Sequence, residues 1–427
     1  MQKRIVVSKA IIFSWVSRYR RWLLSIAGGA LMMILALGTG NWSNLDHYTA
    51  GKGGTNLEFP MSEVAVSKGP SFPPVLAYWI LGSKGDSKRM LRLLRAVYHP
   101  RNQYLLQLDS DSSDQERLDL VLSVEEEKVF RAFGNVYVVG KSYAVNQMGA
   151  SGLAAMLHAA ALLLRLSRDW DWFINLSSSD YPLLTQDDIL YAFTCLPRDV
   201  NFLGFKNITE FNGQYDFNQI AVDPNLYSTE NTPIFYAREG RGSPDAFKIF
   251  GGSPWTTLSR GFMEHCVEGW DNLPRKLLLY YTNVVSPLES YFHTLVCNTP
   301  EFQNSTVNRD LRLHTVKGAL NLLQRDEFTS DLAVFARTFE KDDEAMEGLD
   351  RNVLNRAPDG LVPGKWCLPR STNESVKSGG GEGKVCSSWG DINSVQPGSY
   401  GVKLHKILSK FSAEKESQTN LCRMYTV

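Results

Sequence analysis

The sequence predicts an α/β protein in which helices cover both faces of a mainly parallel sheet, preceded by one N-terminal transmembrane helix. Short apolar runs, typical of strands that are covered on both faces, recur through the first half of the chain. Amphipathic segments with helical spacing separate these runs. A basic segment followed by an uncharged apolar stretch opens the chain. The 427 residues suffice for one large domain or two ordinary ones.

The N-terminal segment has a basic part and then an apolar part. Residues 1–21 carry six Lys or Arg and no acid, whereas residues 22–45 carry no charge. A helix of about 20 apolar residues spans a bilayer core, and its basic flank stays in the cytosol. We therefore expect a cytoplasmic tail over 1–21, a signal anchor over 22–41, a lumenal stem over 42–72 and a lumenal domain over 73–427. The alternative is a cleaved signal peptide, for which both parts are long.

The folded body alternates strands and helices in its first half. The predicted strands are 75–81, 104–108, 136–139, 172–176 and 201–205, and the predicted helices between them are 87–98, 114–133, 152–168 and 186–195. The second half is less regular, with a helix-like segment at 260–270, a further segment at 286–296 and a Ser/Gly-rich loop at 371–384. Ligands bind such sheets at the carboxyl ends of the strands, where Asp109 and Asp180 follow two of them.

The charge balance and the cysteines limit the classes to which this protein can belong. Forty-five basic and 45 acidic residues give a formal net charge of zero, which excludes a general polyanion binder. All six cysteines follow the apolar segment, and an even number in a lumenal domain indicates disulfides. Cys367 and Cys386 flank the Ser/Gly-rich loop and are the expected pair.

Several Asn-x-Ser/Thr sequences are N-glycosylation acceptors in a lumenal domain. The expected acceptors are Asn41, Asn207, Asn304 and Asn373. Asn175 also begins such a sequence, but it lies at the end of an apolar strand, and we expect it to be buried.

Four sequence blocks resemble glycosyltransferase family fourteen. Residues 170–183, WDWFINLSSSDYPL, resemble the signature of that family. Further blocks agree in the same order: 75–78 with 98–104, 252–255 with 258–260, and 286–294. The family contains core-2/I-branching N-acetylglucosaminyltransferases, peptide O-xylosyltransferases and plant-type β-glucuronosyltransferases. The resemblance covers roughly residues 75–345 and implies a GT-A-like fold and transfer with inversion at the anomeric carbon.

The resemblance also implies roles for individual residues. Glu289 matches the position of the catalytic base in the motifs of the family, and Asp109 matches the position of the Asp that contacts the nucleotide. Arg337 matches one cation of a basic pair that holds the donor diphosphate, and Thr338 stands where the family has Lys. A hydroxyl can hydrogen-bond to a phosphate but does not offset its charge. Further candidates are Arg312 and Lys317 for the diphosphate, and Asp180, Ser253 and Trp255 for the sugar or the acceptor.

No metal cofactor is expected from the resemblance. Of the two Asp-x-Asp sequences, 169–171 precedes its strand and fits a turn, whereas 109–111 lies at the carboxyl end of a strand and also suits a helix cap. We therefore expect a nucleotide contact from Asp109 without a metal ion. The nucleotide-sugar donor is a substrate and not a cofactor.

Two segments favour the plant-type branch within this family. Residues 270–275 and 280–283 resemble the branch that adds β-glucuronic acid to galactans of arabinogalactan proteins. The expected function is transfer from UDP-glucuronic acid by a single-pass type II protein of the Golgi membrane. Arg260, His293 and Arg275 are candidates for binding the uronate carboxylate.

Three other functions stay open. A xylose or N-acetylglucosamine donor is the nearest, although Pro254 stands where xylosyltransferases carry Asp. The replacement of Lys by Thr338 suits a non-catalytic Golgi partner that binds glycans. A glycosidase is the least favoured because Glu289 has no evident carboxylate partner in the sequence.

Overall fold

The computed structural model describes residues 66–206, 217–228, 230–314, 332–357, 359–369, 386–413 and 422. Several predicted features lie outside these residues: the span 22–41, most of the stem, the loop 371–384, Lys317, and the acceptors Asn41, Asn207 and Asn373. Within the described ranges, no helix is long and apolar enough to cross a membrane.

A seven-stranded sheet forms the centre of the described part of the chain, with the order β10-β6-β9-β4-β1-β2-β3. Its strands are β1 (Leu76–Gly82), β2 (Gln103–Leu108), β3 (Val136–Val138), β4 (Trp172–Ser177), β6 (Asn201–Phe205), β9 (Gly252–Ser259) and β10 (Thr306–Val307). Strands β3, β2, β1 and β4 pair in parallel, so the carboxyl ends of these four meet at one edge. This mixed α/β fold with a mainly parallel sheet agrees with the expected fold class.

Strand β9 was not predicted, and it runs antiparallel to both of its neighbours, β4 and β6. Its first residues, Gly-Ser-Pro, suggest a turn, but Gly252 serves a close approach of two strands. A Cβ atom added at Gly252 would lie 1.9 Å from the carbonyl oxygen of Gly204 on β6. Only glycine therefore lets β9 pair closely with β6 at this point.

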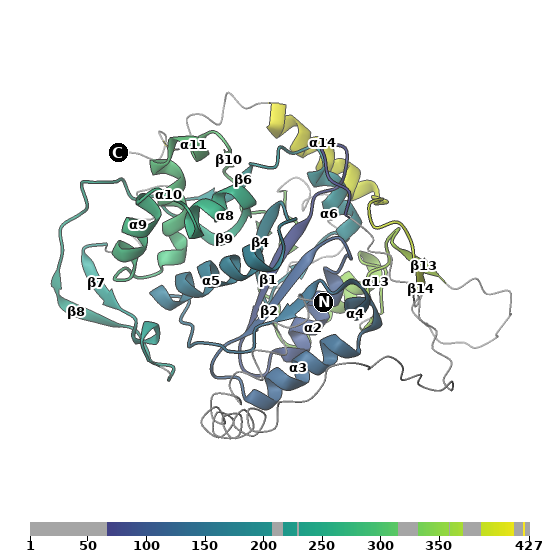
Figure 1. The fold of residues 1–427 in the computed structure, drawn as a ribbon, viewed down its shortest axis with the longest axis horizontal. Coiled ribbons are helices and arrows are strands. Elements are labelled where there is room, and N and C mark those ends of the chain that lie inside the picture. The colour runs from purple at the N-terminus through teal and green to yellow at the C-terminus, as the bar shows by residue number, and fades with distance from the viewer. Residues whose placement is uncertain are drawn as a thin grey trace, which may run out of the picture. The chain divides into compact units, whose positions relative to one another are not determined.

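Helices cover both faces of the sheet (Figure 1). Helices α2 (Ser87–Ala96) and α6 (Gln186–Phe193) lie on one face, where the Tyr78 hydroxyl donates to Gln186 at 3.0 Å. Helix α5 (Ala150–Leu166) lies across the other face and contacts α8 (Arg260–Val267). The predicted helix over 114–133 is two helices, α3 (Asp114–Glu126) and α4 (Lys128–Phe133), because Glu127 is extended.

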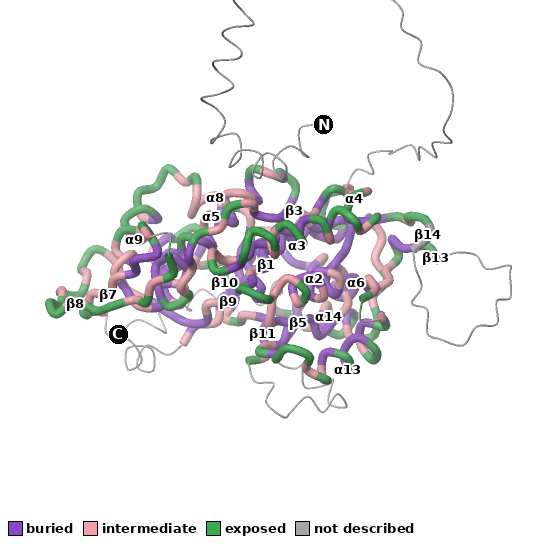
Figure 2. Tube along the Cα trace, turned by 90° about the horizontal axis from the view of Figure 1, so that it is seen from below, coloured by how far each residue is buried: buried purple, intermediate pink, exposed green. Residues whose placement is uncertain are grey.

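The core follows the central strands. Every residue of β4 is buried, and so is every residue of β1 except Leu81, as the apolar runs predict. Figure 2 shows this buried centre and the exposed outer side of α3. Asn175 is buried within β4, as expected, and Asn304 is exposed.

The second half of the chain adds a short turn, further helices and three small sheets to this centre. A 3₁₀ turn, η2 (Pro287–Glu289), precedes α10 (Tyr291–Asn298), and the helices α9 (Leu273–Tyr281) and α11 (Pro300–Gln303) flank α10 in sequence. A small sheet with the order β11-β12-β5 joins β11 (Arg312–Leu313), β12 (Phe335–Ala336) and β5 (Tyr181–Pro182). An exposed hairpin consists of β7 (Gln219–Val222) and β8 (Phe235–Gly240). The C-terminal elements are α13 (Glu344–Asn352), β13 (Cys367–Pro369), β14 (Cys386–Trp389) and α14 (Ser399–Ala413).

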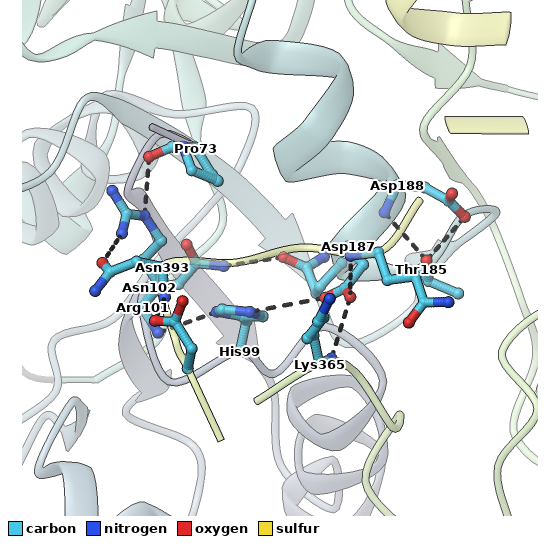
Figure 3. Close-up of polar contacts among 12 residues, drawn as sticks. Pro73, His99, Arg101, Asn102, Thr185, Asp187, Asp188, Lys365 and Asn393 are labelled. Atoms are coloured by element: carbon cyan, nitrogen blue, oxygen red, sulfur yellow. Dashed lines mark hydrogen bonds and ion pairs between the residues drawn. The ribbon is translucent and has the colours of Figure 1, made fainter. Parts of the chain in front are cut away.

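A buried polar cluster lies at the opposite, amino-terminal edge of the sheet (Figure 3). Arg101, which is 1% exposed, donates to the carbonyl oxygen of Pro73 at 2.9 Å and to the side chain of Asn393 at 2.5 Å. Asp187 accepts the backbone N–H of Lys365 at 3.3 Å, and the neutral ring of His99 lies 3.7 Å from it. The cluster fastens the C-terminal segment to the base of the sheet.

The cysteines form a disulfide that the sequence did not indicate. Cys297, in α10, is bonded to Cys422 across a sequence separation of 125 residues. Cys367 is disulfide-bonded as well. The strands β13 and β14 pair, which places Pro369 opposite Cys386, but the side chain of Cys386 lies outside the described set. The Cys367–Cys386 pair therefore stays a prediction.

Candidate active site

A cavity of about 240 Å³ opens at the carboxyl ends of β1 and β4. Four features of its wall bear on chemistry: the Trp255 ring from β9, the Glu289 carboxylate from η2, the Arg337 guanidinium after β12, and Gly152 at the start of α5. The cavity is also lined by Trp79, Leu81, Val145, Gln147, Met148, Asn175, Leu176, Pro254, Ser286 and Leu288. Three segments far apart in the sequence thus supply a carboxylate, a guanidinium group and an aromatic ring to one cavity.

Glu289 is held by a short turn. Ser286 adopts a left-handed backbone with φ 49°, and Pro287 fixes the first position of η2. The backbone N–H of Ser286 donates to the carbonyl oxygen of Met148 at 2.8 Å, which ties the turn to the loop before α5. The Glu289 side chain is 18% exposed, and its Oε2 lies 3.2 Å from Nζ of Lys206. The carboxylate is therefore fixed on the cavity wall with a cation at its side.

Arg337 and Arg312 converge on one carboxylate. The guanidinium of Arg337 stacks 3.9 Å from the centroid of the Trp255 ring, and its Nε lies 3.4 Å from Oδ1 of Asp180. Arg312 is buried and donates through Nη2 to the carbonyl oxygen of Asn175 at 2.9 Å. Within the described residues, Nε and Nη1 of Arg312 have no hydrogen-bond acceptor. Arg337 lines the cavity, whereas Arg312 lies behind the lining residues and does not.

Asp180 does not line the cavity, contrary to the expectation that it shapes the floor. Its side chain is completely buried and accepts the backbone N–H of Ser177 at 2.7 Å. Burial raises the pKa of Asp180, and the charges of Arg312 and Arg337 oppose that rise. Burial also lowers the pKa of both arginines, although a guanidinium remains protonated. Asp180 and Asp310 both interact electrostatically with the two guanidinium groups, so these carboxylates offset part of the positive charge of the arginines.

Ser253 and Thr338 take different places beside this pair. Ser253 is buried and hydrogen-bonds to the carboxylate of Asp310, which also accepts the backbone N–H of Arg312 at 3.1 Å. Ser253 therefore acts on the site through Arg312 and does not face the cavity. Thr338 is exposed and directly follows Arg337.

Asp109 lies beside a second, open depression of about 750 Å³. It follows β2 and accepts the hydroxyl of Ser112 at 3.2 Å. The next two residues, Ser110 and Asp111, line the depression together with Asn146. Since residues 145, 147 and 148 line the first cavity, both hollows share the segment 145–148. In the described part of the chain, no group of three or more His, Cys, Asp or Glu is arranged to hold a metal ion.

The candidates for a uronate site are dispersed. Arg260 bonds to Glu264 at 2.7 Å, and its backbone N–H donates to Asp171, at the amino-terminal edge of the sheet. Arg275 is exposed on α9. His293 is buried with Nε2 3.2 Å from the carbonyl oxygen of Gly204, and burial lowers its pKa to about 4. None of these three lines the cavity.

Lys206 is the residue that the sequence analysis missed. It directly follows β6, and 83 residues separate it from Glu289 in the sequence. No motif or periodicity connects the two positions, because only the packing of η2 against β9 brings them together.

Comparison with known proteins supports a family. Residues 76–318 match the model of the family described as Core-2/I-Branching enzyme. The chain is 40% identical over 374 residues to the β-glucuronosyltransferase GlcAT14A of Arabidopsis thaliana, covering 86% of this chain and 82% of that protein. It is 37% identical to GlcAT14B of the same plant, covering 95% and 96%. Xylosyltransferase 1 of Rattus norvegicus is 29% identical, covering 62% of this chain and 30% of that enzyme.

Solved structures resemble this chain only weakly. Mouse xyloside xylosyltransferase 1 matches with a TM-score of 0.31 and 12% identity, covering 61% of this chain and 97% of that one. The family match covers more than half of the sequence, and both plant relatives align over most of their length. The chain therefore belongs to the core-2/I-branching enzyme family.

Proposed function

We propose that this protein transfers β-glucuronic acid from UDP-glucuronic acid to galactan chains of arabinogalactan-type glycoproteins, with inversion at the anomeric carbon. The observation that carries the proposal is that Glu289 and Arg337 line the same cavity at the carboxyl edge of the sheet. A carboxylate and a guanidinium are the two groups that a metal-free transfer of this kind requires. The choice of glucuronic acid as the transferred sugar rests on the names of the plant relatives, which are β-glucuronosyltransferases.

The two arginines bind the leaving group in the proposed reaction. Arg337 and Arg312 hold the donor diphosphate, with Asp109 at the nucleoside. The charge that develops as the bond from C1 to the phosphate oxygen breaks is thus met by fixed cations. Thr338 adds at most one hydrogen bond. Asp180 and Ser253 keep the arginines in place through the contacts described above, so they are positioning residues.

Glu289 acts on the acceptor. Its carboxylate accepts the proton of a galactose hydroxyl while the oxygen of that hydroxyl forms the new bond to C1. UDP leaves with the electron pair of the broken bond, and Trp255 forms the apolar wall against which the donor sugar lies. No metal ion takes part in this scheme.

A donor screen tests the proposal. Purified full-length protein in detergent should transfer glucuronic acid to a β-galactan oligosaccharide and should give far less product with UDP-xylose or UDP-N-acetylglucosamine. Preferred use of either of these two donors would establish one of the alternatives within the family. Absence of transfer from all three donors, with UDP still bound, would favour the non-catalytic partner that the replacement of Lys by Thr338 suggests.

We also propose that the protein is a single-pass type II protein of the Golgi membrane. The basic tail 1–21 and the apolar segment 22–41 support this topology. Microsomes should protect the domain from added protease, and removal of N-glycans should increase its mobility on gels. Digestion of the domain in intact vesicles would place it in the cytosol and contradict the proposal.

A further inference from the structure

We propose that Lys206 selects the uronic acid donor: its ammonium group binds the C6 carboxylate of the donor sugar while it remains paired with Glu289. The inference rests on the proposed function, because it concerns the donor of that reaction. It names the residue that distinguishes glucuronic acid from the neutral hexose of the same shape.

The position of Lys206 is fixed by its backbone. Its N–H donates to the carbonyl oxygen of Gly251 at 3.0 Å, and the N–H of Phe205 donates to Asn308 at 2.7 Å. From this anchored strand end the side chain reaches Glu289, with 3.2 Å between Nζ and Oε2. The Lys206 side chain is 39% exposed and the Glu289 side chain 18%. The Lys206 side chain as a whole is therefore the more exposed of the two.

Stereochemistry places the donor carboxylate near this pair. In a D-glucopyranosyl ring, C6 projects from the same face as the substituent of a β-glycoside. A β-forming inversion brings the acceptor oxygen to that face of C1, so the base that receives its proton lies there as well. The uronate and Glu289 are then two carboxylates on one side of the ring, and they repel each other unless a cation lies between them. A Lys ammonium has three N–H donors and can serve both.

The other basic side chains near the cavity contact other groups of the protein. Among the residues that line it, the cationic one is Arg337, which is stacked on Trp255 and directed at Asp180. Arg312 is buried behind Asn175. His293 is uncharged, and its Nε2 faces the carbonyl oxygen of Gly204. Arg337 and Arg312 bind the diphosphate in the proposed reaction. Lys206 does not itself line the cavity, but its ammonium group lies 3.2 Å from the carboxylate of Glu289, which does.

The test compares two donors that differ only at C6. The value of kcat/KM is measured with UDP-glucuronic acid and with UDP-glucose for the wild type, Lys206→Met and Lys206→Arg, and UDP affinity is measured by calorimetry. Lys206→Met should lower the preference for UDP-glucuronic acid roughly 10- to 100-fold, the range for a hydrogen bond between charged groups. The loss should fall mainly on KM, and Lys206→Arg should retain most of the preference. UDP affinity should be unchanged in every variant.

A matched control and two outcomes make the result decisive. Lys248→Met removes an exposed lysine, whereas the lysine that pairs with Glu289 is Lys206, so the variant should leave the preference unchanged. Equal losses with both donors in Lys206→Met would overturn the inference, since Lys206 would then act only on the orientation of Glu289. If UDP-glucose is too poor a substrate, the affinity for UDP-glucuronic acid relative to UDP replaces the rate, and an unchanged ratio overturns the inference. A wild type that transfers no glucuronic acid would instead refute the proposed function.

Discussion

The guanidinium group of Arg337 lies flat against the indole of Trp255, with 3.9 Å between its central carbon and the ring centroid. The same group points Nε toward the buried Asp180. Stacking and ion pairing together fix the plane of the guanidinium while its other nitrogens remain available at the cavity wall. An anion that enters the cavity thus meets a cation that needs little rearrangement.

The first prediction follows from this arrangement. Arg337→Lys should weaken UDP binding about 10- to 100-fold, because an ammonium group neither stacks in a plane nor offers a fork of donors to a diphosphate. Titration calorimetry with UDP measures the effect. The matched variant Thr338→Lys adds a cation at the exposed neighbouring position and should tighten UDP binding. Tighter binding by Arg337→Lys, or weaker binding by Thr338→Lys, would place the diphosphate elsewhere.

Glu289→Gln should reduce kcat by about 10²- to 10⁴-fold, because an amide cannot accept the acceptor proton as a general base. UDP affinity should stay near that of the wild type, since Glu289 acts on the acceptor and not on UDP in the proposed reaction. Single-turnover kinetics with UDP-glucuronic acid separates the two effects. Turnover equal to that of the wild type would remove Glu289 from the reaction.

The enzyme should retain its full activity in excess EDTA. The scheme assigns charge neutralisation to the two arginines, so chelation removes nothing that the reaction needs. Initial rates are compared with and without chelator after extensive dialysis. Loss of activity that manganese restores would instead make the sequence 109–111 a metal site.

The polar cluster at the base of the sheet predicts a pH dependence of stability. Burial raises the pKa of Asp187 from 3.8 to about 6, so the folded state holds its proton where the unfolded chain has lost it. The contribution of this group is fully present below the lower value and is lost as pH rises through the upper one. The unfolding free energy of the wild type minus that of Asp187→Asn should therefore be more positive at acid pH, by about 3 kcal/mol.

Urea denaturation of both proteins across that range measures this difference. His99 opposes the gain in wild-type stability toward acid pH. Burial lowers the pKa of His99 to about 3, so the unfolded chain takes up a proton at a higher pH than the folded protein does. The comparison with the variant removes the part of that contribution that does not depend on Asp187, which lies 3.7 Å from His99. A difference that stays constant or shrinks toward acid pH would contradict the raised pKa of Asp187.

Much of the fold was predictable because the signals are local. Apolar runs covered on both faces mark β1 and β4, and helical spacing marks α2 and α5. Strand β9 escaped prediction because its glycine serves a close approach between two strands, which only the folded state displays.

Residues that stand in a family block could be named as candidates from the sequence. Glu289, Trp255 and Arg337 line one cavity, and their roles in the reaction stay predictions. Asp180 was expected on the cavity floor and is buried under the arginines, since a sequence motif does not tell which side of a turn a carboxylate faces. Lys206 carries no motif, and its pairing with Glu289 arises only from tertiary packing.

The bond between Cys297 and Cys422 bears on how the protein can be produced. Helix α10, which contains Cys297, begins at Tyr291, just after the turn that carries Glu289. A host whose folding compartment is reducing would leave both sulfurs as thiols and detach the C-terminal segment from this helix. Secretion through an oxidising compartment should preserve the disulfide between Cys297 and Cys422. The last six residues include Cys422, so a variant that lacks them would lose this bond close to the turn that carries Glu289.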